Sequence, residues 1–363
     1  MVTKENFCEM KVAEKEQIER LAQNPLIAFE RKYDGTAAIL DVNTNEDRQQ
    51  FVGRGVLDDG TQQNYTDVFP ELMPSVNDLI DSVERGEKHL DYKVADFKFV
   101  GEIVNFDENG NDYFKGIEKR CNRKKDRDKY AKEYPAHFVV FDVLDWNGHS
   151  LEMTPFGERR NILEELNKHF EDTERMILIP QLRDEEAKIE LVKKTESGEC
   201  GIEGIVAKGL DAPYGRGVFK YKYKDTYDVF WEGEYKPGNG RHEGRIGALI
   251  CYQYINGVKT HVADVGGGLT DKLRDEFTIL ADTGQVSASK PMVFAIQAHE
   301  VFPTGKMRYP NYVATRFDKA PSQCVGYIGE KVKKPDEHMK SILKMTALDL
   351  KPKAITQSLD DWI

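Results

Sequence analysis

Lys32 is the residue of this chain whose type and setting most directly suggest covalent chemistry. It lies three residues before Gly35, and apolar residues flank this short polar segment on both sides. Because the flanks are typical of strands, rigid backbone would hold the lysine and direct its amine into the space that the sheet encloses. Most lysines that interrupt strands are solvated edge residues that discourage aggregation. The spacing alone therefore leaves two interpretations open.

Four further charged residues interrupt segments that are otherwise typical of strands. Glu102 and Glu203 have apolar neighbours, and Lys222 and Lys224 alternate with tyrosines. Each alone is more easily interpreted as an edge charge or an ion-pair partner. Charges are rarely placed in strand interiors without a partner, however. Together with Lys32 they predict one pocket lined with charge.

These residue types predict attack by a lysine on a metal-bound nucleotide phosphate. Lys222 and Lys224 point the same way because the strand period is two, so they would face an anion such as a phosphate. The paired glutamates would hold a divalent hard cation, Mg²⁺ or Mn²⁺. A lysine crowded by other lysines is expected to have a lowered pKa, which makes its amine a nucleophile near neutral pH.

The elements that must position these residues alternate along the first part of the chain. The hydrophobic pattern predicts helices over 4–23, 75–85, 115–132, 158–170 and 184–197. It predicts strands over 26–32, 36–42, 98–106, 137–144, 201–208 and 219–224. The candidate residues thus lie in or beside strands.

Near residue 228 the pattern becomes β-rich. Strands over 229–236, 245–255, 258–265 and 292–301, with one helix over 270–281, predict a small β-barrel such as an OB-fold. We therefore expect one domain over 1–228, a second over 229–348, and a tail over 349–363.

Composition limits the compartment and the partners. With 39% apolar and 32% charged residues, the 363-residue chain is globular and can form two domains that each bury a core. No apolar run approaches the roughly 20 residues of a membrane helix. The five cysteines include no Cys-x-x-Cys pair, which disfavours structural zinc and predicts a reducing cytoplasm. We expect a monomer that binds no membrane.

The net charge of −11 argues against indiscriminate coating of nucleic acid but leaves room for local basic surfaces. Between Lys115 and Lys132 there are nine Lys/Arg and three Asp/Glu. Composition favours a solvated helix face there, and a surface that follows phosphates is the alternative.

Lys32-Tyr33-Asp34-Gly35 resembles the K-x-D-G nucleophile motif of covalent nucleotidyltransferases, which include DNA ligases, RNA ligases and mRNA capping enzymes. Later segments follow in the order of that family, namely Gly53-Arg54-Gly55, Val100-Gly101-Glu102, Phe141 to Gly148 with Glu158-Arg159-Arg160, Glu203 to Lys208, and Lys222-Tyr223-Lys224. Two positions depart from the pattern. Val100 replaces an aspartate, and no tryptophan precedes Lys222.

The second domain continues the resemblance. Segments 243–249 and 265–271 resemble the OB domain of ligases, and Arg308 and Arg316 lie in segments similar to its C-terminal arginine motif. Over about residues 25–320 the chain resembles a compact ATP-dependent DNA ligase. The resemblance implies an α+β fold, with an ATP-grasp-like adenylation (nucleotidyltransferase) domain of antiparallel sheets and helices followed by an OB-fold barrel.

The resemblance implies a three-step reaction with Lys32 as the catalytic nucleophile. Lys32 attacks the α-phosphate of ATP to give lysyl-AMP, AMP moves to the 5′-phosphate of a nick in duplex DNA, and the 3′-hydroxyl displaces it. Glu102 and Glu203 would bind the metal. The implied nucleotide-binding residues are Glu30, Arg31, Tyr33, Asp34, Gly35, Arg54, Glu102, Phe141, Glu203, Lys222, Lys224, Arg308 and Arg316.

Several of these residues have specific implied roles. Glu30 would read the adenine edge, and Phe141 would stack on the base. Lys222 and Lys224 would neutralise charge on the α-phosphate in the transition state. The two arginines of the second domain would orient pyrophosphate once that domain closes.

Ala37 departs from the DNA-ligase pattern, in which many members carry an arginine five residues after the lysine. Thr36-Ala37-Ala38 is closer to several RNA ligases, so an RNA ligase is the alternative function. The OB domain with its arginine motif favours a DNA ligase.

The tail has two interpretations. A frayed terminus is favoured. The alternative is a peptide with Leu359 and Trp362 as anchors, similar to the sliding-clamp-binding tails of T4-like phage replication proteins. That interpretation would point to a phage-encoded protein in the host cytoplasm.

Overall fold

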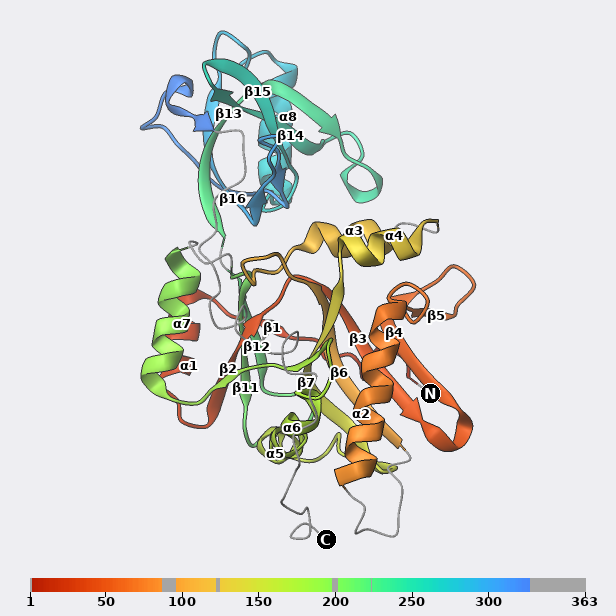
Figure 1. Ribbon diagram of the computed structural model, residues 1–363. Coiled ribbons are helices and arrows are strands. Elements are labelled where there is room, and N and C mark those ends of the chain that lie inside the picture. The colour runs from red at the N-terminus through yellow and green to blue at the C-terminus, as the bar shows by residue number, and fades with distance from the viewer. Residues whose placement is uncertain (1, 87–95, 122–124, 198–201, 223, 327–363) are drawn as a thin grey trace. The chain divides into compact units, whose positions relative to one another are not determined.

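The computed structural model describes residues 2–86, 96–121, 125–197, 202–222 and 224–326 (Figure 1). The chain divides into two compact units between Lys222 and Tyr223. The predicted boundary at residue 228 falls within a strand of the second unit, β13 (Asp225–Pro237). The predicted tail over 349–363 lies outside the described residues.

Two sheets form the framework of the first unit. One has the strand order β1-β12-β11-β2-β10, and the other has the order β5-β4-β3-β6-β7-β8 with β9 beside β7. Their bounds are β1 (Lys11–Val12), β2 (Ile27–Lys32), β3 (Thr36–Asn43), β4 (Arg48–Val56), β5 (Gln62–Asn64), β6 (Asp96–Asn105), β7 (Ala136–Trp146), β8 (His149–Ser150), β9 (Met176–Leu178), β10 (Gln181–Leu182), β11 (Gly204–Gly209) and β12 (Val218–Lys222).

Helices cover the outer faces of these sheets. They are α1 (Lys15–Ala22), α2 (Met73–Gly86), α3 (Phe114–Cys121), α4 (Arg127–Glu133), α5 (Phe156–Glu165), α6 (Asn167–Phe170) and α7 (Glu185–Ser197), with 3₁₀ turns at Lys4–Asn6, Thr44–Glu46 and Pro70–Leu72. Figure 1 shows α1 and α7 side by side on the sheet that contains β2. Phe29 of β2 is buried in that layer with Ile18 and Val192. Because side chains alternate along a strand, Glu30 and Lys32 lie on the opposite face.

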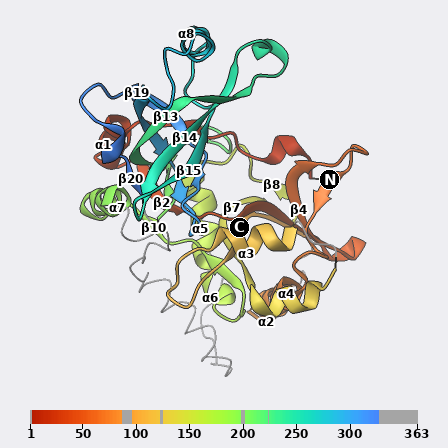
Figure 2. The same ribbon diagram turned by 90° about the horizontal axis from the view of Figure 1, so that it is seen from above.

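The second unit is a small barrel. Its main strands are β13, β14 (Ile246–Ile255), β15 (Val258–Val265), β16 (Met292–Ala298) and β19 (Asn311–Thr315), in the order β15-β14-β13-β16-β19. A parallel bridge between Gly267 and Asn311 joins the two ends of this order, and Figure 2 shows the strands curving around one another. Helix α8 (Asp271–Asp282) lies between the third and fourth strands in sequence. This connectivity confirms the predicted OB-fold. The minor elements are β17 (Glu300–Val301), β18 (Met307–Arg308), β20 (Val325–Gly326) and 3₁₀ turns at Gly240–His242 and Pro321–Gln323.

The predicted helix over 4–23 is wrong in its first half. Only Lys15–Ala22 is an α-helix, because Lys11 and Val12 pair in parallel with Phe219 and Lys220 of β12. The predicted helix over 115–132 is instead two helices, α3 and α4, and residues 122–124 between them lie outside the described residues.

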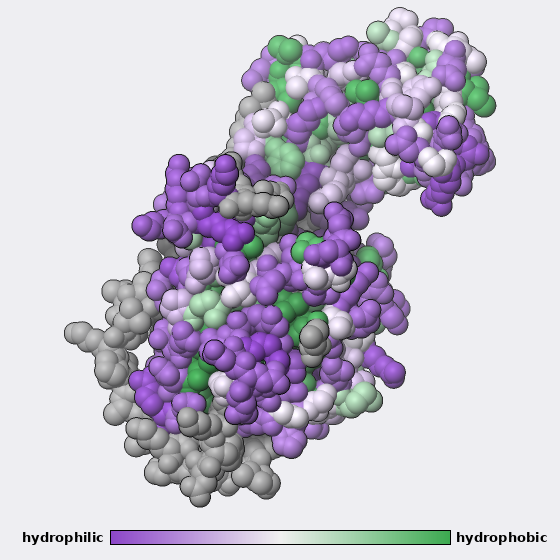
Figure 3. Space-filling model, turned by 90° about the vertical axis from the view of Figure 1, so that its right-hand side faces the viewer, coloured by the Kyte–Doolittle hydropathy of each residue, from purple (hydrophilic) through white to green (hydrophobic). Residues whose placement is uncertain are grey.

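Hydrophilic side chains cover most of the face shown in Figure 3, as the charged content of 32% predicts. Within the described part of the chain, we find no helix with the length and apolar character needed to cross a membrane.

Candidate active site

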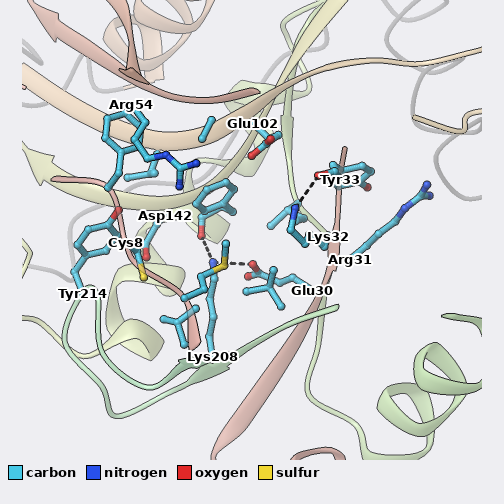
Figure 4. A pocket seen from close by; sticks show the side chains of 18 residues that line it. Cys8, Glu30, Arg31, Lys32, Tyr33, Arg54, Glu102, Asp142, Lys208 and Tyr214 are labelled. Atoms are coloured by element: carbon cyan, nitrogen blue, oxygen red, sulfur yellow. Dashed lines mark hydrogen bonds and ion pairs between the residues drawn. The ribbon is translucent and has the colours of Figure 1, made fainter. Parts of the chain in front are cut away.

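A pocket in the first unit collects many of the predicted site residues. It encloses about 820 Å³ of empty space, part of it open to solvent, and residues of both sheets line it (Figure 4). The predicted residues that line it are Glu30, Arg31, Lys32, Tyr33, Arg54, Glu102 and Phe141.

Strand register brings Lys32 and Glu203 together. Gly204 of β11 lies opposite both Lys32 of β2 and Lys222 of β12. A Cβ atom at Gly204 would come within 3.0 Å of the Lys222 Cα and closer still to the Tyr221 carbonyl oxygen, so glycine permits this close approach. The Lys32 Nζ lies 2.6 Å from Glu203 Oε2, and the Lys222 Nζ forms an ion pair with Glu203 Oε1.

The electrostatics of Lys32 differ from the prediction. Burial lowers the pKa of Lys32, but the Glu203 and Glu102 carboxylates outweigh that effect, and the net pKa is raised above its ordinary value. The predicted lowering is therefore wrong, because the nearest charges are acidic. Burial also raises the pKa of Glu102 to about 7, against the attraction of the Lys32 charge and with further repulsion from Glu203 and Asp34.

The turn after Lys32 packs directly against β6. A Cβ atom at Gly35 would lie 2.9 Å from the Glu102 Cγ and would overlap the Ile103 carbonyl oxygen. Only glycine therefore lets this turn approach the strand that carries Glu102. Beside the turn, the buried Tyr33 ring packs edge-on against Phe106, with centroids 5.7 Å apart.

The other end of the pocket holds a buried carboxylate. Glu30 is 1% exposed, and its Oε2 lies 2.7 Å from the Lys208 Nζ. Its Oε1 accepts a hydrogen bond of 3.2 Å from Gln181 Nε2. Lys208 also donates to the Phe141 carbonyl oxygen at 2.9 Å, and its Nζ lies 4.7 Å from the centre of the Phe141 ring.

Lys208 and Asp142 also line the pocket, although the sequence analysis predicts no role for either. Asp142 lies in the family-like segment Phe141 to Gly148, and Lys208 ends the segment Glu203 to Lys208. Asp142 lines the pocket and is held by Arg159 through two contacts, Nε to Oδ1 at 2.7 Å and Nη2 to Oδ2 at 2.9 Å. Phe7, Cys8 and Met10 also line the pocket. No motif in the sequence indicates these three.

Lys220 is a further missed residue. It lies two positions before Lys222 on β12, on the same face, and its pKa is lowered by burial and by the positive charges of Lys222, Lys32 and Arg54. Lys224 follows the end of β12 and belongs to the second unit. The structure therefore pairs Lys222 with Lys220 on the strand rather than with Lys224.

Two predicted arginines also belong to the second unit. Arg308 ends β18, and Arg316 follows β19. Arg316 binds Asp318 through Nε and Nη2 at 2.8 Å each, and its Nη1 donates to Asp228 Oδ1 at 3.2 Å. Acidic neighbours within the second unit thus hold this guanidinium.

Fold and pocket together define a mixed α+β adenylation domain followed by a β-rich unit. The family model described as "ATP dependent DNA ligase domain" matches residues 9–224, which is more than half of the chain. The chain belongs to the ATP-dependent DNA ligase family.

Individual relatives agree with this assignment. The chain is 31% identical over 320 residues to the DNA ligase of Thermococcus fumicolans, a match that covers 82% of this chain and 53% of the relative. It is 30% identical over 288 residues to DNA ligase 2 of Methanosarcina acetivorans, covering 72% and 50%. The chain thus spans about half the length of the curated relatives it matches. The relatives are mainly archaeal, so they give no support to a phage origin.

Solved structures share the fold. A chain named Pmar-Lig_PreS3 has a TM-score of 0.61 at 17% identity, with 85% of this chain and 67% of that chain covered. A Lig E DNA ligase, solved in work on DNA binding with a minimal scaffold, has a TM-score of 0.54 at 16% identity, with 85% and 98% covered.

Proposed function

We propose that this protein is an ATP-dependent DNA ligase that seals nicks in duplex DNA through a lysyl-AMP intermediate. The observation that carries the proposal is the Lys32 amine, held 2.6 Å from Glu203 in a pocket lined by both sheets of a ligase-family adenylation domain. In the first step the Lys32 nitrogen forms a bond to the α-phosphorus of ATP. The bond from that phosphorus to the bridging oxygen breaks, and pyrophosphate leaves.

The ion pairs in the pocket suggest how the nucleophile is controlled. An amine must lose a proton before it can attack, and the Glu203 carboxylate favours the charged form of Lys32. Anything that draws the Glu203 charge away from Lys32 therefore promotes the deprotonated amine. Lys220 and Lys222 remain on the same strand face to compensate negative charge on the α-phosphate.

The base end of the pocket suits adenine. Phe141 offers a ring for stacking, and Glu30 is a buried acceptor whose position Lys208 fixes. Phe141 thus lines the pocket with the Lys208 ammonium 4.7 Å from the centre of its ring. We infer that Glu30 and Phe141 recognise the base, as the sequence predicts, and that Lys208 positions both.

Glu102 in the pocket and Glu203 beside Lys32 fit a magnesium or manganese ion. Among the described residues, no cluster of three or more His, Cys, Asp or Glu side chains could hold a metal unaided. Glu102 and Glu203 nonetheless offer hard oxygen donors, and Mg²⁺ is commonly bound by one or two carboxylates together with substrate phosphates. Burial, with added repulsion from Glu203 and Asp34, raises the pKa of Glu102 to about 7, and a bound cation would favour the charged form of this carboxylate. The ion would supply charge neutralisation at the phosphates.

Arg308, Arg316 and Lys224 would act from the second unit. We propose that movement of this unit brings the arginines to the pyrophosphate, and that the Asp228 and Asp318 contacts hold Arg316 until then. Binding of a sliding clamp by the tail, a monomeric state and a cytoplasmic location remain predictions of the sequence.

The first test is covalent labelling. The protein is incubated with α-³²P-ATP and magnesium and then analysed under denaturing conditions. We expect an acid-labile label on the wild type and none on Lys32→Ala or after chelation with EDTA. As a matched control, Lys236→Ala removes an exposed lysine of the second unit, which pairs with Asp264. Equal labelling of Lys32→Ala and wild type would refute the mechanism.

The second test identifies the polynucleotide. The adenylylated protein is offered nicked duplexes that carry DNA or RNA on either side of the nick. We expect sealing of DNA nicks. Ala37 lies opposite Glu102 where many DNA ligases place an arginine, so sealing of RNA ends alone would assign the protein as an RNA ligase instead.

A further inference from the structure

Asp112 contacts the residues on both sides of Lys32, the Arg31 side chain before it and the Asp34 backbone nitrogen after it. Its Oδ1 lies 2.6 Å from Arg31 Nη2, and its Oδ2 accepts a hydrogen bond of 2.7 Å from the Asp34 backbone nitrogen. The Asp112 and Arg31 residues are 5% and 9% exposed. One buried carboxylate thus connects the residue before the nucleophile with the turn that follows it. Figure 4 shows the Arg31 side chain running away from the Lys32 amine.

The loop that carries Asp112 is itself fixed to β6. Asp112 forms a bridge with Phe106, and the Tyr113 nitrogen donates to the Asn105 carbonyl oxygen at 2.7 Å. Asp107 closes the turn, because its Oδ1 accepts hydrogen bonds from the Asn109 and Asn111 backbone nitrogens at 2.8 and 2.9 Å. β6 also carries Glu102, whose charge acts on Lys32, so the loop is anchored to a strand that lines the same pocket.

We propose that Asp112 is a positioning residue for the nucleophile. It sets the direction of the Lys32 side chain by holding the Arg31 guanidinium and the Asp34 backbone nitrogen, and it does so from the β6 side of the pocket. The inference rests on the proposed function. A charged bridge between buried groups is stiff, because breaking it leaves an unpaired buried charge. Displacement of a reacting group by about 1 Å can cost on the order of 100-fold in rate.

The test separates the steps that use Lys32 from the one that does not. Lysyl-AMP formation is followed in a single turnover with α-³²P-ATP. Sealing is followed on a nicked duplex whose 5′-phosphate already carries AMP, so that no lysine attack is needed. We expect Asp112→Ala to slow lysyl-AMP formation on the order of 100-fold, with sealing of the pre-adenylylated nick at the wild-type rate. Asp112→Asn should slow the first step less, because its amide oxygen still accepts from the Asp34 nitrogen.

Glu108→Gln is the matched control. It removes one negative charge from an exposed position in the same loop, and both rates should stay unchanged. Equal loss of both rates in Asp112→Asn would indicate a merely structural role and overturn the proposal, as would normal labelling of Asp112→Ala. Failure of the wild type to take up label would refute the proposed function itself, so the two failures are distinguishable.

Discussion

Asp142→Ala is expected to destabilise the first unit by about 4 kcal/mol, because it leaves the buried Arg159 guanidinium without its carboxylate. The side chains of Arg159 and Asp142 are only 2% and 5% exposed. Both carboxylate oxygens contact the guanidinium, at 2.7 and 2.9 Å, in the bidentate arrangement. The guanidinium is therefore largely shielded from water, which can replace the lost partner only in part.

The size of the destabilisation comes mainly from leaving the buried Arg159 charge without a partner, and less from the lost attraction between Arg159 and Asp142. Removing one member of a buried pair costs about 3–5 kcal/mol, whereas replacing both members by apolar residues is often neutral. Asp142→Leu combined with Arg159→Met should therefore recover most of the lost stability. For a unit of this size, about 4 kcal/mol corresponds to a fall in Tm of roughly 8–16 °C.

The free energy of unfolding of the first unit alone is measured by urea unfolding, with hydrogen exchange in peptides of β6 and β7 as the readout. Glu174→Ala is the control, because its ion pair with Arg175 is similarly short at 2.6 Å but the glutamate side chain is 53% exposed. An exposed pair contributes only about 0–1 kcal/mol. If Asp142→Ala lowers the free energy of unfolding no more than Glu174→Ala does, the reasoning is refuted.

Three further predictions test the turn, the strand register and a buried histidine. Gly35→Ala should abolish ATP labelling without loss of secondary structure by circular dichroism, because a Cβ atom would overlap the Ile103 carbonyl oxygen. Lys220→Met should reduce labelling as strongly as Lys222→Met, and a normal rate would show that β12 presents Lys222 alone. Burial lowers the pKa of His169 to about 4 from its ordinary 6.5, so below pH 6.5 the unfolded chain binds the extra proton. Stability should fall by on the order of 2 kcal/mol as pH drops from about 6.5 towards 4, and equal urea midpoints for wild type and His169→Gln at both pH values would contradict this.

Strands with a clear hydrophobic pattern were predictable from the sequence. The predicted spans 26–32 and 36–42 match β2 and β3 to within one residue. A strand that is buried on one or both faces needs apolar residues there, so each segment carries a recognisable hydrophobic pattern. β1 was not predictable. It is two residues long and exposed, and it exists only because it pairs with the distant strand β12.

Site residues divide in the same way. Lys32 has a local signal, since a motif surrounds it. Lys208 also ends a family-like segment, Glu203 to Lys208, but its pairing with Glu30 depends on the register between β11 and β2, which that segment does not reveal. Lysines alternate with tyrosines from Lys220 to Lys224, so the sequence allows either Lys220 and Lys222 or Lys222 and Lys224 as the pair on one strand face. Because β12 ends at Lys222, the structure favours Lys220 and Lys222 as that pair.

Under the proposed function, the balance of charge around Lys32 would favour joint binding of a phosphate chain and a divalent cation. Two lysines share the single carboxylate of Glu203, so a polyphosphate can compete for them. Glu102 has a pKa of about 7 and therefore exchanges its proton readily near neutral pH, and a cation can replace that proton. Entry of a phosphate chain with a divalent cation would thus weaken the contact that keeps Lys32 charged. In the proposed mechanism, substrate binding would therefore itself promote deprotonation of the Lys32 amine.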